Sequence, residues 1–172
     1  MIQEIKYSEF SSKLHDTAVR NDIPLDGTIA LTTHCNLNCG HCYIRDNSTK
    51  HELTSDEIFR IIDEITAAGC VYLLMTGGEP LLRPDFKDIY AYARKKGLIV
   101  SLFTNGTLLD KETVQLLKKY MPFSVEITLY GASPETYESF TGTRGTYDAC
   151  MNGIKLLMEQ TSADIKDHGD NH

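Results

Sequence analysis

The chain has 172 residues, of which 41% are hydrophobic and 24% charged, as is ordinary for a globular protein with one sizeable core. Its formal net charge of −7 argues against sequence-independent binding to nucleic acid, which needs a basic face, so no nucleic-acid partner is expected. No apolar run approaches the roughly 18 residues that cross a bilayer, and residues 1–10 lack the apolar segment of a secretory signal, so we expect a cytoplasmic protein without a membrane partner.

The first third of the chain contains a polar leader and the start of an alternating pattern. The leader covers residues 1–27, and a short helix is expected near residues 8–19. A β-prone run at residues 28–33 predicts a strand that leads directly into a cysteine-rich segment. Thr54 and Glu57 then stand at the spacing of a capping box, so a helix is expected to begin there.

The same strand-then-helix cycle repeats along the rest of the chain. In order, the expected elements are a strand at 71–75, a helix at 85–96, a strand at 98–103, a helix at 110–120, a strand at 123–129 and helices at 134–140 and 147–160. Residues 161–172 are polar and are expected to form a disordered tail. Because strands alternate with helices, the pattern predicts right-handed crossovers and a parallel sheet.

Each expected strand ends in a polar or glycine-rich turn. Parallel α/β proteins bind ligands at the carboxyl edge of the sheet, where these turns meet. The segments that fall there are the cysteines, Gly77–Glu79, Asn105–Gly106 and Thr128–Gly131. Only four strands are recognisable, and an open four-stranded parallel sheet has an exposed edge. We therefore interpret the chain as a fragment, a truncated reading frame or half of something larger.

Three of the five cysteines, Cys35, Cys39 and Cys42, share one short segment with the spacing C-x3-C-x2-C. An odd number of cysteines with one tight group is a poor disulfide framework and indicates metal or cluster ligation. Three thiolates suit one iron–sulfur cluster and leave one iron without a protein ligand. A zinc site completed by His34 or His41 is the alternative, and three free structural thiols are a third interpretation.

Two motifs together resemble those of the radical S-adenosylmethionine (SAM) superfamily. The cysteine triplet is similar to the first motif of that family, and Thr76-Gly-Gly-Glu-Pro80, which begins 34 residues after Cys42, is similar to the second. The match runs from about residue 28 to residue 158. Residues 127–147 further resemble the branch that modifies peptides or proteins and carries a C-terminal SPASM or twitch domain.

The resemblance implies an α/β fold, a partial (β/α) TIM-like barrel with a parallel sheet. About four of the usual six βα units would be present, in a core at residues 28–160. It also implies a 4Fe–4S cluster held by Cys35, Cys39 and Cys42, with SAM as second cofactor. Reductive cleavage of SAM would then give a 5′-deoxyadenosyl radical for hydrogen abstraction from a peptide or protein substrate. An external one-electron reductant such as flavodoxin or ferredoxin is a further expected partner.

The resemblance assigns the remaining cofactor contacts by position, to Gly77, Gly78, Glu79, Thr128, Arg144 and His41. The two glycines would let the backbone approach the methionyl group. The glutamate would accept hydrogen bonds from the SAM ammonium, and the arginine would pair with the SAM carboxylate. The threonine would lie near the ribose, and the histidine would lie beside the adenine.

Some positions depart from the family pattern or have a simpler interpretation. Tyr130 stands where relatives with Leu-Asp-Gly have an aspartate. Asn105–Gly106 suits a plain turn at least as well as a SAM contact. Cys70 and Cys150 suit the core. Two alternative functions stay open at this point, an inactive truncated remnant of such an enzyme and a zinc-binding interaction module.

Overall fold

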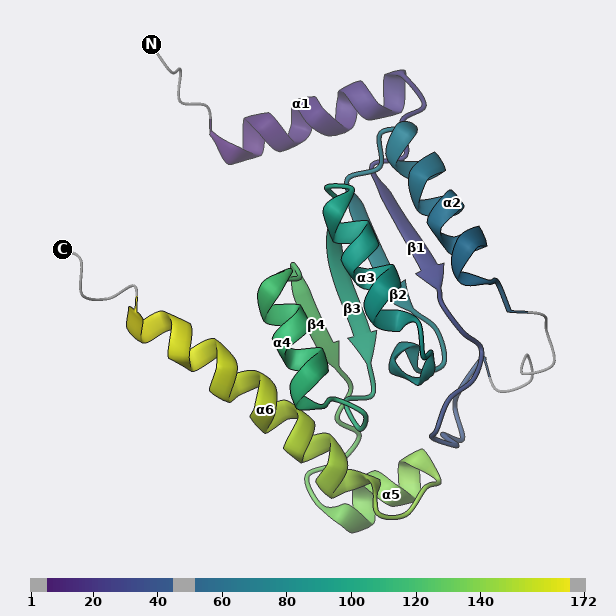
Figure 1. Ribbon diagram of the computed structural model, residues 1–172, viewed down its shortest axis with the longest axis vertical. Coiled ribbons are helices and arrows are strands. Elements are labelled where there is room, and N and C mark those ends of the chain that lie inside the picture. Colours follow the sequence, from purple (N-terminus) through teal and green to yellow (C-terminus); the bar gives the residue numbers. More distant parts are fainter. Residues whose placement is uncertain (1–5, 45–51, 168–172) are drawn as a thin grey trace.

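The computed structural model describes residues 6–44 and 52–167, and within them the chain forms one four-stranded parallel sheet (Figure 1). The strands lie in the order of the sequence, β1 (Asp26–Ala30), β2 (Tyr72–Thr76), β3 (Ile99–Thr104) and β4 (Ser124–Ile127). Each neighbouring pair is parallel. The expected parallel α/β architecture is therefore confirmed, because each strand is followed by a helical connection that returns the chain to the same end of the sheet.

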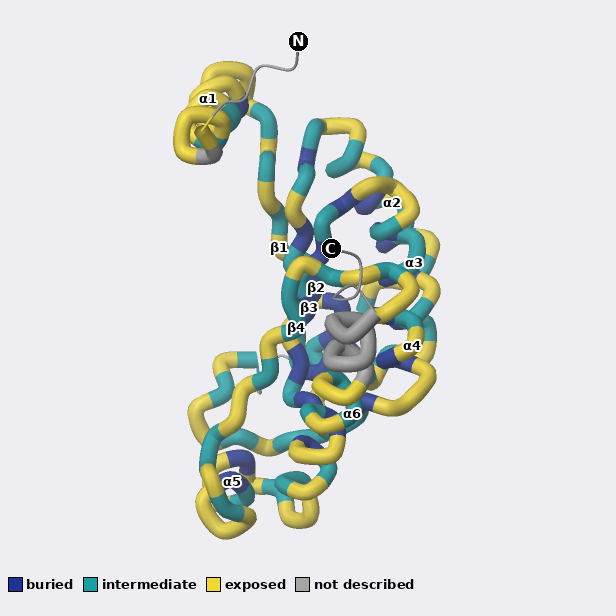
Figure 2. Tube along the Cα trace, turned by 90° about the vertical axis from the view of Figure 1, so that its left-hand side faces the viewer, coloured by how far each residue is buried: buried dark blue, intermediate teal, exposed yellow. Residues whose placement is uncertain are grey.

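Helices cover one face of this sheet and extend beyond both of its ends (Figures 1 and 2). The helices in chain order are α1 (Tyr7–Arg20), α2 (Ser55–Ala67), α3 (Phe86–Lys95), α4 (Lys111–Lys119), α5 (Pro134–Thr141) and α6 (Thr146–Asp167), with a short 3-10 turn at Pro80–Leu82. The covering layer is formed by α2, α3 and α4. Helix α6 packs against α4 and α5. Helix α1 lies near the amino ends of the strands, and α5 lies beyond their carboxyl ends.

The hydrophobic core lies between the sheet and the covering helices. Alternate residues of β2 and β3, among them Met75, Val100 and Leu102, point into it and are fully buried. They meet the apolar stripe of α2, where Ile58 and Ile62 are also fully buried. Each such side chain stabilises the fold by about 1.5–3 kcal/mol relative to an exposed one. The apolar stripe of α2 therefore forms a buried face against the sheet.

The other face of the sheet is open in the described part of the chain. Its residues alternate with the core residues, as strand geometry requires. The exposed positions on this face are Asp26, Thr28, Ala30, Tyr72, Phe103 and Glu126. This face is more polar than the core face, so the sheet has a covered apolar side and an open mixed side.

Local capping explains where the helices begin. The Thr54 hydroxyl accepts a hydrogen bond from the Glu57 amide, and the Glu57 carboxylate accepts one of 2.8 Å from the Thr54 amide. This is the expected capping box. A second box at Ser133 and Thr136 starts α5, and Asp110 caps α4.

Most expected element bounds differ from the structure by one to three residues, and the two bounds of the expected core at residues 28–160 also move. The first strand begins at Asp26, two residues inside the expected leader. The last helix continues to Asp167, so residues 161–167 of the expected polar tail are helical. The expected disorder of residues 168–172 lies outside the described residues. In the part that the structure describes, no helix combines the length and the apolar character needed to cross a membrane.

Candidate functional site

The cysteine loop leaves the carboxyl end of β1 and carries Cys35, Cys39 and Cys42, all as free thiols. Cys35 is exposed and the other two are half-buried. Burial is the main cause that raises the pKa of Cys39, and the neighbouring Cys35 and Cys42 thiolates raise it further. Burial also raises the pKa of Cys35, and Cys42 contributes to that shift. Each thiolate thus disfavours the ionisation of its neighbours, and the positive charge of bound iron would offset this repulsion and favour the three thiolates.

Three cysteines in one loop are the usual kind of ligand for an iron–sulfur cluster. Among residues 6–44 and 52–167, no three His, Cys, Asp or Glu side chains converge on one ion position. The zinc interpretation requires such convergence with His34 or His41. Instead, His34 Nε2 lies 3.8 Å from Glu52, and His41 Nε2 lies 3.1 Å from the Tyr130 hydroxyl.

The turn after β2 packs directly on the backbone that leads into the cysteines. The Gly78 amide donates to the Thr32 carbonyl at 2.8 Å, and the Glu79 amide donates to the His34 carbonyl at 2.8 Å. A Cβ on Gly77, whose φ is +138°, would lie 2.4 Å from the Thr32 carbonyl oxygen, and one on Gly78 would lie 2.2 Å from that of His34. Both positions therefore require glycine for this close approach. A contact with the SAM methionyl group stays a prediction.

Glu79 is fully buried and joins the ends of β2 and β3. Its Oε1 accepts hydrogen bonds from the Thr104 hydroxyl at 2.7 Å and the Leu81 amide at 3.0 Å, and its Oε2 accepts one of 2.7 Å from the Asn105 amide. Burial raises the pKa of Glu79, while these hydrogen bonds act in the opposite direction. The carboxylate thus has an intramolecular function in this structure, and the expected bond to the SAM ammonium stays a prediction.

Three aromatic rings gather beside the cysteine loop. The His41 ring lies 5.0 Å from the Tyr130 ring and 4.6 Å from the Phe140 ring, and Tyr130 stacks on Phe140 at 4.6 Å. Burial is the main cause that raises the pKa of Tyr130, and a nearby Cys39 thiolate adds to it while a hydrogen bond with Thr128 opposes it. The structure therefore brings the expected residues His41 and Thr128 together with Tyr130, next to the thiols.

The last part of the segment at residues 127–147 also contacts the cysteine loop, through the backbone of Thr141 and Gly142. The Asn38 amide donates to the Thr141 carbonyl at 2.9 Å. Gly142, with φ +63°, passes so close that a Cβ there would lie 2.5 Å from the Asn38 carbonyl oxygen. The Glu138 carboxylate accepts from backbone amides at the start of α6, at 2.7 and 3.1 Å, which holds this turn in place.

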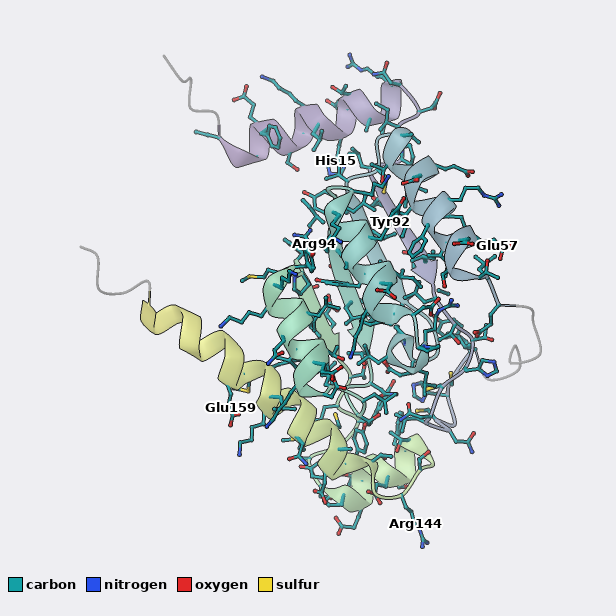
Figure 3. The ribbon with its side chains drawn as sticks, in the orientation of Figure 1. His15, Glu57, Tyr92, Arg94, Arg144 and Glu159 are labelled. Atoms are coloured by element: carbon teal, nitrogen blue, oxygen red, sulfur yellow. The ribbon has the colours of Figure 1, made fainter. Side chains whose placement is uncertain are left out.

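Arg144 lies in the same turn but is not brought to the cysteines. Its side chain is exposed, and Figure 3 shows it projecting outward beyond α5. Its pairing with the SAM carboxylate stays a prediction that requires a different side-chain orientation.

Sequence reasoning missed an arginine, with a side chain only 9% exposed, that holds both ends of the cysteine segment. Arg83 donates to the Leu31 carbonyl at 2.9 Å and to the Leu53 carbonyl at 3.0 Å. It also forms a two-bond ion pair with Asp85, at 2.9 and 2.6 Å, which lowers the pKa of Asp85 to about 2. The signal available in the sequence was an arginine three residues after the Gly-Gly-Glu-Pro turn. Its contacts with Leu31 and Leu53 arise only when the folded chain brings these segments together.

A second missed group surrounds Asn105, which the sequence places in a turn. Its side-chain Nδ2 lies 3.8 Å from Cys35 Sγ and 2.8 Å from Asn36 Oδ1. Asn36 Nδ2 in turn donates to the Thr107 hydroxyl at 2.8 Å, and that hydroxyl donates to Asn105 Oδ1 at 2.6 Å. These three side chains form a closed ring of hydrogen bonds against the first cysteine.

The fold and the site together define an α/β protein with three cysteines gathered at the carboxyl edge of a parallel sheet. A sequence profile described as "Radical SAM superfamily" matches residues 29–167. The chain belongs to this superfamily, whose members are enzymes that use a 4Fe–4S cluster and SAM. The family expected from the cysteine triplet and the Gly-Gly-Glu-Pro turn is therefore confirmed.

Individual relatives are similar over most of this chain. An AdoMet-dependent heme synthase of Methanosarcina barkeri is 42% identical over 133 residues, which are 75% of this chain and 38% of that protein. The antilisterial bacteriocin subtilosin biosynthesis protein AlbA of Bacillus subtilis is 36% identical over 139 residues, which are 80% of this chain and 31% of AlbA. The chain thus spans about a third of the length of these relatives.

A solved structure supports the fold. The crystal structure of Streptococcus suis SuiB bound to precursor peptide SuiA superposes with a TM-score of 0.71 at 21% identity. The match covers 88% of this chain and 35% of SuiB. At this identity the likeness shows the fold alone, and it confirms the expected partial TIM-like barrel.

Proposed function

We propose that this chain carries the cluster-binding and SAM-binding part of a radical SAM enzyme that modifies a peptide or protein. The observation that supports it is the gathering of Cys35, Cys39 and Cys42 in one loop whose backbone packs on Gly77 and Gly78. In this arrangement the three thiolates hold the cluster and leave one iron free of protein ligands. When bound, the reduced cluster and SAM supply a 5′-deoxyadenosyl radical that abstracts hydrogen from the substrate.

The remaining residues orient SAM and limit the space around it. The glycine turn offers backbone groups without side chains next to the cysteine loop, which suits close contact with the methionyl group. Thr128 and His41, which lie together beside Tyr130, form the side that we assign to ribose and adenine. Glu79 and Arg144 are the proposed partners of the SAM ammonium and carboxylate.

A peptide or protein substrate is supported by the relatives. AlbA is named for the biosynthesis of the bacteriocin subtilosin, and SuiB is described in complex with a precursor peptide. A second candidate is action on a tetrapyrrole, which the 42% identity to a heme synthase favours. Both candidates share the cofactor chemistry and differ only in the molecule from which hydrogen is taken.

The cofactor half of the proposal is tested on the full chain under anaerobic conditions. After reconstitution with iron and sulfide, we expect about four irons per chain and formation of 5′-deoxyadenosine from SAM when dithionite is added. Cys39→Ser should abolish both. Cys70→Ser is the matched control, because Cys70 lies outside the loop and its sulfur faces the Leu25 and Tyr72 carbonyls, which a serine hydroxyl can also use. Near-stoichiometric zinc without visible absorbance would contradict the proposal.

The substrate half is tested by stimulation of SAM cleavage. The rate of 5′-deoxyadenosine formation is measured alone, with the synthetic product of any short open reading frame found beside this gene, and with iron coproporphyrin III. We expect the peptide to increase the rate and the porphyrin to leave it unchanged. Stimulation by the porphyrin alone would replace the peptide assignment by the second candidate.

A further inference from the structure

Asn105 stands at the carboxyl end of β3 and connects the Gly-Gly-Glu-Pro turn to the cysteine loop. Its backbone amide donates to Glu79 Oε2 at 2.7 Å, which anchors its main chain to a fully buried carboxylate. Its side-chain Nδ2 reaches Cys35 Sγ at 3.8 Å, a distance suited to a hydrogen bond to sulfur. The residue therefore lies between the two motifs that define the site.

The orientation of the Asn105 amide follows from its partners. The backbone amide of Thr107 lies 2.9 Å from Asn105 Oδ1. A backbone amide can only donate, so the oxygen of the Asn105 side chain must face Thr107. The amino group of the side chain must then face Asn36 Oδ1 and Cys35 Sγ. The hydrogen-bonding partners themselves thus decide which end of the amide points at the sulfur.

We propose that Asn105 is a positioning residue that donates an N–H···S hydrogen bond to the Cys35 thiolate and thereby raises the reduction potential of the cluster. This inference rests on the proposed function, because it assigns Cys35 to iron. Asn105 is not assigned a contact with SAM or with the substrate. Its action on the chemistry passes through the sulfur of the first cysteine.

The physical reason is electrostatic. Reduction adds one negative charge to the cluster and its thiolates, and a fixed N–H dipole pointing at a sulfur stabilises the more negative state. Outer-shell donors of this kind also orient the ligand. Cys35 Sγ already accepts a hydrogen bond from the Leu37 amide of its own loop at 3.4 Å, so Asn105 provides a second donor, from the turn after β3. Removal of that donor disfavours the reduced state and leaves the ligand itself intact.

The test uses the reconstituted full chain, with redox titration monitored by electron paramagnetic resonance. Asn105→Asp keeps the shape but turns a carboxylate oxygen toward the sulfur, and we expect the equilibrium constant for reduction to fall about tenfold, which is about 59 mV for a one-electron couple. Asn105→Ala removes the donor without adding charge and should shift the potential in the same direction by less. Iron content per chain should stay at the level of the unsubstituted protein.

Two control variants distinguish an effect of the N–H···S hydrogen bond on the reduction potential from a general disturbance of the structure or its charge. Thr107→Val breaks the side-chain ring but keeps the backbone amide that orients Asn105, so the potential should stay unchanged. Asn152→Asp makes the same charge change at an exposed position on α6 and should also have no effect.

Each of three outcomes would contradict one claim: the effect of the hydrogen bond, the role of Asn105 as its donor, or the proposed function. If Asn105→Ala and Asn105→Asp keep the unsubstituted potential, the N–H···S bond does not tune the cluster. If Thr107→Val shifts the potential as much as Asn105→Ala, the ring and not the donor is responsible. If the unsubstituted chain assembles no 4Fe–4S cluster, the proposed function fails before this inference is reached.

Discussion

Charged side chains with little or no exposure join separate segments of backbone at the carboxyl edge of the sheet. Glu79 accepts hydrogen bonds from the ends of β2 and β3, and Arg83 binds the carbonyls on both sides of the cysteine segment. A buried polar group is stable only when its partners are present, so such residues are sensitive to single-atom changes. At the scale of single residues, we therefore predict the effects of replacing one side chain by another of nearly the same shape.

Glu79→Gln should destabilise the chain without any cofactor present. Each carboxylate oxygen faces a backbone amide that can only donate, that of Leu81 or that of Asn105. Either orientation of the glutamine therefore points an N–H at another donor, and we expect the free energy of unfolding in urea to fall by about 1–3 kcal/mol. Glu112→Gln, at an exposed ion pair, should change it by less than about 1 kcal/mol. Equal stability of the two variants would mean that the Glu79 carboxylate is free for another partner.

The lowered pKa of Asp85 predicts that the folded chain loses stability in acid. Its pKa in the folded chain is about 2 against an ordinary value of 3.8, chiefly because of Arg83. As the pH falls, the unfolded state binds the proton first, so stability present above pH 3.8 is lost progressively down to about pH 2. The total is about 2 kcal/mol.

The measurement is urea unfolding at a series of pH values between 5 and 2. Asp85→Asn should remove this part of the acid dependence and lower the stability at neutral pH. Ser55→Ala removes only a secondary donor and should retain most of the dependence. An unchanged acid profile in Asp85→Asn would refute the assignment.

The cysteine loop is held by elements from both halves of the described chain. The turn after β2 binds it through backbone hydrogen bonds, and the turn between α5 and α6 binds it at Asn38. Helix α5 begins with a capping box, and Glu138 accepts bonds from the start of α6, so this turn is itself well anchored. The loop thus depends on elements more than 100 residues away in the sequence.

Two glycines in this turn provide a matched comparison. Gly142 and Gly145 both have positive φ, +63° and +74°, but only Gly142 would place a Cβ within 4 Å of another atom outside its neighbours. Gly145→Ala should cost about 1–2 kcal/mol for the left-handed conformation alone. Gly142→Ala should cost more, because its Cβ would lie 2.5 Å from the Asn38 carbonyl oxygen. Urea unfolding compares the two variants, and equal losses would contradict the close packing of this turn on the loop.

At the scale of the whole molecule, the hydrophobic core and the cysteine loop lie in different places. The core is formed by β2, β3 and the covering helices, and it contains none of the three loop cysteines. The loop extends beyond the carboxyl edge and is held mainly by polar contacts. Folding of the core is therefore expected to be independent of the cofactor.

Removal of the cluster should leave the fold in place. The variant with Cys35, Cys39 and Cys42 all changed to serine should keep the far-ultraviolet circular dichroism of the unsubstituted chain and a cooperative thermal transition. The reason is that the buried apolar area that stabilises the sheet is unaffected. Collapse of the helical signal in this variant would show that the cluster contributes to folding, as structural zinc does in small domains.

Much of the fold was predictable because its signals are local. The isoleucines of α2 repeat at helical spacing, and the strands β2 and β3 are short apolar runs bounded by glycine turns. Boundaries shifted by a few residues, at β1 and at the end of α6, where backbone pairing and helix propagation outweigh composition. The parallel order of the strands followed from the alternation of elements.

The sequence alone determined the family, since the spacing of three cysteines and a Gly-Gly-Glu-Pro turn is a property of residue types along one chain. Only the tertiary structure decided the partners of those residues. It directed Glu79 to the end of β3, Arg144 outward, and Asn105 to the sulfur of Cys35. The reason is that hydrogen bonds between segments depend on the distance and direction of groups brought together by packing, and linear spacing carries neither.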